Sequence, residues 1–300
     1  MFTFKTIAEL VDLATQKQLP LSEIVWRWET ERSGETPDII WEKMRLRLDA
    51  IKESAYAGIQ EKNKTFNNLV GGDAYRTNQQ TYLLGPTAKK ALVYALAVSE
   101  VNANMGKIVA CPTAGSCGIV PGALLAAAEQ LGCSDEVLVR ALFTAAGIGA
   151  VIAQNASVSG AVGGCQAECG SAAAMAAGAV VEMLGGAPEQ SAHAMALALK
   201  NTLGLVCDPV AGLVEVPCVK RNGFIAVHSL VGAEMALSGV ESAIPVDEVI
   251  DAMYRIGLAL PASLRETAEA GLAKTPTAVA ITEKLLKPVL VCCVFLFQWV

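Results

Sequence analysis

Histidine is nearly missing from this sequence, which has only His193 and His228 among its 300 residues. A metal site would therefore rest mainly on thiolate or carboxylate ligands, because imidazole is so scarce. The Cys-x-x-Cys spacing of zinc ribbons and thioredoxins is also absent. No Gly-x-x-x-x-Gly-Lys-[Ser/Thr] phosphate loop occurs, and the glycines at 160, 163 and 164 miss the Gly-x-Gly-x-x-Gly dinucleotide spacing.

The sequence also lacks an excess of positive charge and long uninterrupted apolar runs. The formal net charge is -6 and the pI is near 5.1, which argues against a nucleic-acid partner because no basic stripe could neutralise phosphates. Apolar residues make up 53% of the chain, but Gln154 and Asn155 interrupt the stretch 141–164, and Glu182 interrupts the stretch that starts at Ala172. These runs favour tightly packed buried helices over membrane spans. The N-terminus lacks the features of a signal peptide, so a cytoplasmic protein without a membrane partner is expected.

An alternating strand pattern is almost absent, and the expected fold class is mainly α. Thr6 to Glu9 form a capping-box pattern, and Thr36-Pro37 is typical of a helix start. Pro188 and Pro245 stand where later helices should begin. Beyond the N-terminal helices, the pattern predicts helices at about 86–104, 120–131, 135–153, 167–184, 188–203, 224–238 and 246–259. We expect an N-terminal helical segment (1–70), a catalytic domain (71–288) and an atypical apolar tail (289–300).

Three segments, 111–122, 155–165 and 206–218, are not expected to be helical. Each combines glycine or proline with hydroxyl, amide or thiol side chains, and loops on a rigid scaffold are where functional sites concentrate. These segments are therefore the candidates for the chemistry of the protein.

The cysteines are ambiguous from their spacing alone. Disulfides are not expected in a reducing compartment, so the thiols are either small buried apolar residues or ligands of a metal group. Cys165 and Cys169 are four residues apart and could share a helix face, but ferredoxin-type spacing is absent. Cys165, Cys207 and Cys218 each lie at a glycine- or proline-rich break, where free backbone amides could donate hydrogen bonds to cluster sulfurs.

Five ordered motifs give the sequence a specific resemblance. They are Asn102-Ala-Asn-Met-Gly106, Pro112-Thr-Ala-Gly-Ser116, Gly163-Gly-Cys-Gln-Ala-Glu168, Cys207-Asp-Pro-Val-Ala-Gly212 and Val216-Pro-Cys-Val-Lys-Arg-Asn222. Together they resemble the α subunit of the iron–sulfur-dependent L-serine dehydratases, from Gly71 to about Pro276. The resemblance implies the helical serine dehydratase α-chain fold with an N-terminal helical extension.

The resemblance also implies a cofactor and a reaction. The family holds a 4Fe–4S cluster on three cysteines, which match Cys165, Cys207 and Cys218. Three ligands leave one iron open as a Lewis acid for the hydroxyl of L-serine, which is converted to pyruvate and ammonia. The family's complete enzyme also carries a smaller module, either fused or supplied as a β subunit, and we expect a β subunit as partner here.

The candidate substrate-binding residues come from the non-helical segments. Thr113 and Ser116 are candidates to bind the substrate carboxylate, and Asn155 and Ser157 could also contact the substrate. These hydroxyls could equally be caps and turn formers. Lys220 and Arg221 could offset cluster charge or bind the carboxylate. No general base is identified, since neither histidine falls in a motif, and the base could come from the partner.

The sequence departs from the family pattern near its end, where Ala270 stands in place of the usual glycine and an apolar segment follows Pro288. Two other functions stay open at this point. One is a related cysteine desulfidase, and the other is a non-catalytic iron–sulfur protein that transfers electrons or senses oxygen. A kinetic comparison of serine with cysteine as substrates distinguishes a desulfidase from a serine dehydratase. A fully ligated, redox-reversible cluster without lyase activity would indicate the non-catalytic protein.

Overall fold

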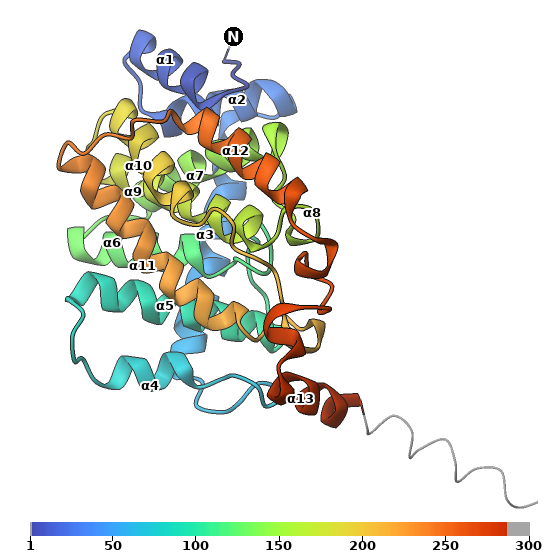
Figure 1. Ribbon diagram of the computed structural model, residues 1–300. Helices are drawn as coiled ribbons and strands as arrows, with labels where there is room; N and C mark the ends of the chain where they lie inside the picture. Colours follow the sequence, from blue (N-terminus) through green and yellow to red (C-terminus); the bar gives the residue numbers. More distant parts are fainter. Residues whose placement is uncertain (1, 287–300) are drawn as a thin grey trace, which may run out of the picture.

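The computed structural model describes residues 2–286, and these residues form helices joined by loops, without a β-strand (Figure 1). The mainly α fold class is therefore confirmed. The α-helices are α1 (Ile7–Lys17), α2 (Leu21–Ser33), α3 (Pro37–Gln60), α4 (Asp73–Gln79), α5 (Pro86–Ala103), α6 (Ile119–Leu131), α7 (Asp135–Asn155), α8 (Gly160–Gly163), α9 (Ser171–Met183), α10 (Pro188–Lys200), α11 (Cys218–Leu237), α12 (Val246–Ala259) and α13 (Pro276–Leu286). The expected tail at 289–300 lies outside the described residues.

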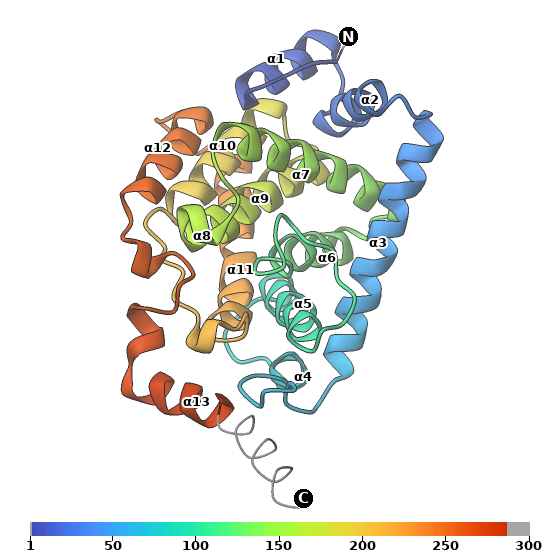
Figure 2. The same cartoon turned by 90° about the vertical axis from the view of Figure 1, so that its right-hand side faces the viewer.

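The N-terminal helices form one end of the molecule and extend along one side. In both views α1 and α2 lie at the end opposite α4 and α13, and Figure 2 shows α3 running along the side between these ends. The Thr6 side chain caps α1 by accepting a hydrogen bond from the Glu9 amide at 3.1 Å. Pro37 is the first residue of α3, as its position after Thr36 predicts.

Helices α5, α6, α7, α9 and α11 form the core and pack closely because their contact faces carry small residues. A Cβ added at Gly122 of α6 would lie only 2.7 Å from the Ala91 carbonyl of α5. At Gly118, just before α6, the corresponding distance to the Ala95 carbonyl would be 2.3 Å. These glycines allow the backbones to approach more closely than any side chain would permit.

Helix α7 is long and apolar enough, by length and composition alone, to cross a membrane. Most of its apolar window is buried inside the protein, against α9, α2 and α3. This burial is that of a core helix, and it agrees with the expectation drawn from the interrupted apolar runs.

Most helix boundaries fall close to the predicted ones. The segment 155–165, which was expected to be non-helical, contains the short helix α8 (Gly160–Gly163). Two predicted helix starts were also wrong. Helix α11 begins at Cys218 and not near 224, so the third candidate ligand is the first residue of a helix. The helix predicted from 167 starts instead with a five-residue π-helix, Gln166–Gly170, which then continues as α9. Both differences lie beside the candidate site, where tertiary contacts determine the backbone.

Candidate functional site

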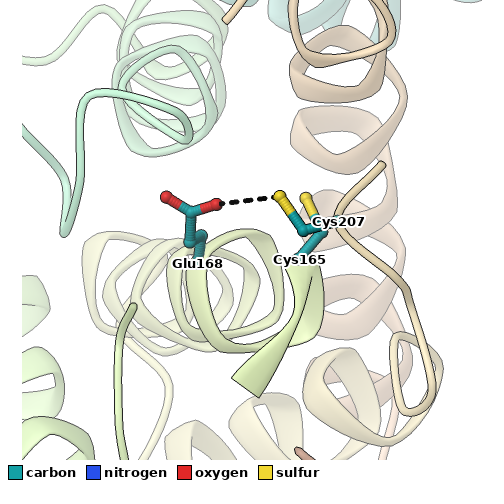
Figure 3. A group of neighbouring side chains, drawn as sticks. All are labelled: Cys165, Glu168 and Cys207. Carbon is teal, nitrogen blue, oxygen red and sulfur yellow. Dashed lines mark hydrogen bonds between the residues drawn. The ribbon is translucent and has the colours of Figure 1, made fainter. Parts of the chain in front are cut away.

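The carboxylate of Glu168 lies where the segments 111–122, 155–165 and 206–218 meet. Glu168 Oε2 is 4.0 Å from the sulfur of Cys207, and Cys165, Glu168 and Cys207 form a buried group whose ligand atoms all lie within 4.8 Å of one another. In Figure 3 the sulfurs of Cys165 and Cys207 lie together, and the Glu168 carboxylate faces the Cys207 sulfur. Two thiols and a carboxylate at this spacing could bind a metal ion or a metal cluster.

Cys165 and Glu168 are held in place through the residue next to Cys165. Gln166 is fully buried, and its side-chain amide donates hydrogen bonds to the carbonyls of Gly163 and Met253. Its side-chain oxygen accepts a hydrogen bond from the Gly204 amide at 2.9 Å. These bonds tie the start of the π-helix to α12 and to the loop that leads to Cys207.

Cys207 lies on an extended segment that pairs with residues far along the chain. Its amide donates a hydrogen bond to the Leu264 carbonyl, and its carbonyl accepts one from the Glu266 amide at 2.8 Å. Glu266 has a φ of 64°, a left-handed conformation that is uncommon for a residue other than glycine. The backbone of Cys207 is thus fixed from both sides.

The segment that carries Thr113 lies against the other side of Glu168. The Thr113 hydroxyl donates a hydrogen bond of 2.6 Å to Glu168 Oε1. Asn222 of α11 holds this loop, since its side-chain amide donates to the Gly115 carbonyl at 2.7 Å and its oxygen accepts from the Gly118 amide at 2.9 Å. The loop, the π-helix and α11 are therefore joined through buried hydrogen bonds.

Two glycines leave room for the carboxylate. A Cβ at Gly115 would lie 2.9 Å from Glu168 Oε1, and one at Gly160 would lie 2.6 Å from Glu168 Oε2. Gly160 belongs to the segment 155–165, so all three segments singled out from the sequence contribute to this site. Any larger residue at either glycine would press on the carboxylate.

The charged groups of the site affect each other's ionisation. Hydrogen bonds from the thiols of Cys169 and Cys207, together with the Arg221 guanidinium, hold the pKa of the Cys165 thiol well below its usual value. Burial raises the pKa of Glu168 to about 7. Arg221 also lies 3.7 Å from Asp208 and donates a hydrogen bond to the Val206 carbonyl, so its charge is held close to the cysteines.

Cys218 is buried at the start of α11. Its sulfur does not belong to the group of Cys165, Glu168 and Cys207, whose ligand atoms lie within 4.8 Å of one another. Burial raises the pKa of the Cys218 thiol to about 12, and the charge of Cys165 adds to this effect. The set of Cys165, Cys207 and Cys218 as three cluster ligands stays a prediction.

The other candidate residues differ in how they are engaged. Ser116 is fully buried and donates its hydroxyl to the Cys111 carbonyl, whereas Thr113 is only partly buried. Asn155 donates hydrogen bonds to the carbonyls of Lys5 and Val151, and the Ser157 hydroxyl accepts one from the Ser159 amide. These bonds are structural, and substrate contacts by these side chains stay predictions.

Lys220 and Arg221, adjacent in sequence, act on different sides of α11. Lys220 forms an ion pair of 2.6 Å with Asp73 of α4, whereas Arg221 lies beside Cys165. Of the two, Arg221 is the one placed to offset negative charge at the cysteines.

Sequence reasoning missed Glu168 as a functional residue, although it stands in the Gly163–Glu168 motif. The available signal was its spacing, because a carboxylate three residues after Cys165 on a helix shares its face. Cys169 is buried in the core, and its sulfur lies 3.4 Å from that of Cys165.

The sequence matches a family model described as "Serine dehydratase alpha chain" over residues 16–273. The chain belongs to the serine dehydratase alpha chain family. It is 49% identical over 288 residues to the probable L-serine dehydratase, alpha chain, of Bacillus subtilis, covering 94% of this chain and 95% of that one. It is 42% identical over 286 residues to the L-serine dehydratase, alpha chain, of Peptoniphilus asaccharolyticus, covering 94% and 98% of the two chains. The resemblance drawn from the five motifs is thereby confirmed.

Some relatives in this family are longer single chains. L-serine dehydratase 1 of Escherichia coli is 45% identical over 184 residues, which are 60% of this chain and 40% of that one.

The departure from the family pattern at Ala270 is compatible with the fold, because the φ of Ala270, -148°, is extended backbone that any residue adopts. Gly271, by contrast, has a φ of 60° and lies against the Asp208 side chain, so glycine is needed there.

Proposed function

We propose that this chain is the catalytic α chain of an L-serine dehydratase, which removes water from L-serine to give pyruvate and ammonia. The observation that carries the proposal is the meeting of the segments 111–122, 155–165 and 206–218 at Glu168, beside Cys165 and Cys207. The names of the relatives support the choice of L-serine as substrate.

We infer that Cys165, Cys207 and Cys218 hold a 4Fe–4S cluster. Buried thiols that lie close together, one of them with a lowered pKa, are suitable ligands for iron because thiolates are what iron–sulfur clusters bind. When bound, such a cluster with one open iron supplies a Lewis acid that stabilises the departing hydroxide. The Arg221 guanidinium offsets part of the negative charge that thiolate ligands bring.

Glu168 is our candidate for the group that accepts the Cα proton of serine. It is a buried carboxylate between the candidate ligands and the candidate carboxylate-binding loop. A base must be within hydrogen-bonding reach of the proton that it removes, and this position meets that need for a substrate held between the loop and the cysteines. In this scheme the Thr113 hydroxyl orients Glu168, and the amides of its loop bind the substrate carboxylate.

We also propose a β subunit as partner, which the name "alpha chain" of the relatives supports. Phe66 and Met105 are 88% and 93% exposed, and the Phe66 amide donates a hydrogen bond to the Asn104 side chain, so the two lie close together. The nearby Asn102 donates a hydrogen bond to the Ala114 carbonyl of the Thr113 loop. A β subunit that covers this apolar surface would close the site from the side of that loop.

The decisive experiment is anaerobic reconstitution of the chain with ferrous iron and sulfide, followed by measurement of iron, sulfide, visible absorbance and pyruvate formation from L-serine. Pyruvate formation from serine is expected to be low from the chain alone and to increase when a candidate β chain is added, and L-cysteine serves as the competing substrate. Iron bound without sulfide would contradict the cluster, and hydrogen sulfide released faster from cysteine than pyruvate from serine would contradict the substrate.

A further inference from the structure

Cys169 is a buried thiol for which the proposed reaction has no use. Its side chain is 1% exposed, and its sulfur lies 3.4 Å from that of Cys165. In an α-helix, Cβ atoms four residues apart are about 5–6 Å from each other, farther than the roughly 3.5–4.5 Å of a disulfide. The π-helix Gln166–Gly170 begins directly after Cys165 and contains Cys169, and its smaller rise per residue brings residues four apart closer together.

Cys207 is the competing partner for Cys165, but its position is more constrained. Its backbone is held on both sides by hydrogen bonds to Leu264 and Glu266, on a segment separate from the π-helix. Cys165 and Cys169 belong to one continuous helical segment, and their sulfurs already lie 3.4 Å apart. The geometry therefore favours Cys169 as the partner.

We propose that Cys165 and Cys169 form a reversible disulfide when the chain carries no cluster and encounters hydrogen peroxide. The Cys165 sulfur attacks one peroxide oxygen, the O–O bond breaks, and the thiol proton leaves with the other oxygen as water. The resulting sulfenic acid is attacked by the Cys169 sulfur, the S–O bond breaks, and the oxygen leaves as a second water with the Cys169 proton. Two thiols have then given two electrons to one peroxide molecule.

The disulfide protects Cys165 from irreversible oxidation. While it is present, the Cys165 sulfur cannot bind a cluster. A sulfenic acid that finds no thiol is oxidised further to sulfinic acid, which ordinary thiol reductants do not reverse. A disulfide with Cys169 stops Cys165 before that stage, and a thiol reductant restores both sulfurs. This role goes beyond the proposed dehydration and rests on it only in taking Cys165 as a ligand.

The test uses the full, cluster-free chain, reduced under anaerobic conditions and then treated with hydrogen peroxide. Free thiols are blocked, and the protein is digested with a protease that cleaves after glutamate, which separates the two cysteines at Glu168. Mass spectrometry is expected to find the Cys165 and Cys169 peptides linked. Reductant should release them, and subsequent anaerobic reconstitution should restore the visible absorbance of the untreated protein.

A Cys169→Ala variant tests the protective role. After the same peroxide treatment its Cys165 is expected as sulfinic acid, and reductant followed by iron and sulfide should leave most of the absorbance lost. Cys133→Ala is the matched control, because Cys133 follows α6 on the half-buried surface and should behave as wild type. Before peroxide, all three proteins should bind iron equally, which establishes that the variants fold.

Three results would overturn the proposal: a wild-type link from Cys165 to Cys207, no link at all, or a Cys169→Ala variant that recovers as well as wild type. Peptide mapping on the cluster-free chain does not depend on serine turnover. A chain that forms the link but never dehydrates serine would therefore refute the proposed function and leave this inference standing.

Discussion

Replacing Glu100 with glutamine removes a buried carboxyl group that contacts Asp73, the ion-pair partner of Lys220. Glu100 of α5 is 1% exposed, and its Oε1 accepts a hydrogen bond of 2.7 Å from the Asp73 amide at the start of α4. Its other oxygen has no hydrogen-bond partner. Burial raises the pKa of Glu100 to about 7, and the negative charge of Asp73 adds to this effect.

The direction of the pH effect follows from this raised pKa. Because the folded protein holds the Glu100 proton more tightly than the unfolded chain does, the stabilising contribution is fully present below the ordinary value of 4.5. It is lost progressively as the pH rises from that value to about 7, and the loss is complete above it. The gap between the two pKa values corresponds to about 3 kcal/mol of unfolding free energy.

The assay is urea unfolding of wild type and Glu100→Gln at about pH 5 and about pH 9. Glutamine keeps the oxygen that accepts from Asp73 and carries no charge. Its stability relative to wild type should therefore improve by about 3 kcal/mol between the two pH values. Glu53→Gln, at an exposed position, should show no such change. An equal difference between wild type and Glu100→Gln at both pH values would refute the reasoning.

Other expected outcomes concern catalysis and partner binding. Glu168→Gln should lower kcat for serine by about 10²–10⁴-fold with cluster absorbance retained, and unchanged kcat would remove it as the base. Gly160→Ala should sharply reduce activity because its methyl group would lie 2.6 Å from Glu168 Oε2, whereas Gly85→Ala, with no neighbour within 4 Å, should stay active. Met105→Lys should weaken binding of a β chain in a pull-down or titration, whereas Leu131→Lys, 42% exposed at the end of α6, should not; equal binding by both would contradict the proposed surface.

The helical architecture could be predicted from the sequence because its signals are local. Pro37 and Pro188 each begin a helix, and the apolar periodicity places α5, α6 and α12 within a residue or so of their observed bounds. The start of α11 was missed although Pro217 directly precedes it, because the contacts that hold its first turn come from remote segments.

The candidate site was only partly predictable. Glycine, proline and thiol content identified the three segments, but 42 residues separate Cys165 from Cys207, and spacing alone gives no reason for them to meet. The family resemblance supplied that link. The π-helix, which places Cys169 against Cys165, has no known signal in a single sequence and was missed.

The first turn of α11 explains why the observed helix start matters for the site. Successive helical residues point about 100° apart, so consecutive side chains reach different neighbours. Lys220 reaches Asp73 of α4, Arg221 lies beside Cys165 and Asp208, and Asn222 holds the backbone of the Thr113 loop. Cys218, one turn before Asn222, shares its face, and its carbonyl accepts a hydrogen bond from the Asn222 side-chain amide. A helix that began only at 224 would leave all four residues on an irregular segment, without a common frame. Because α11 begins at Cys218, one rigid turn positions a candidate ligand, a cation for the cysteines and the candidate substrate loop together.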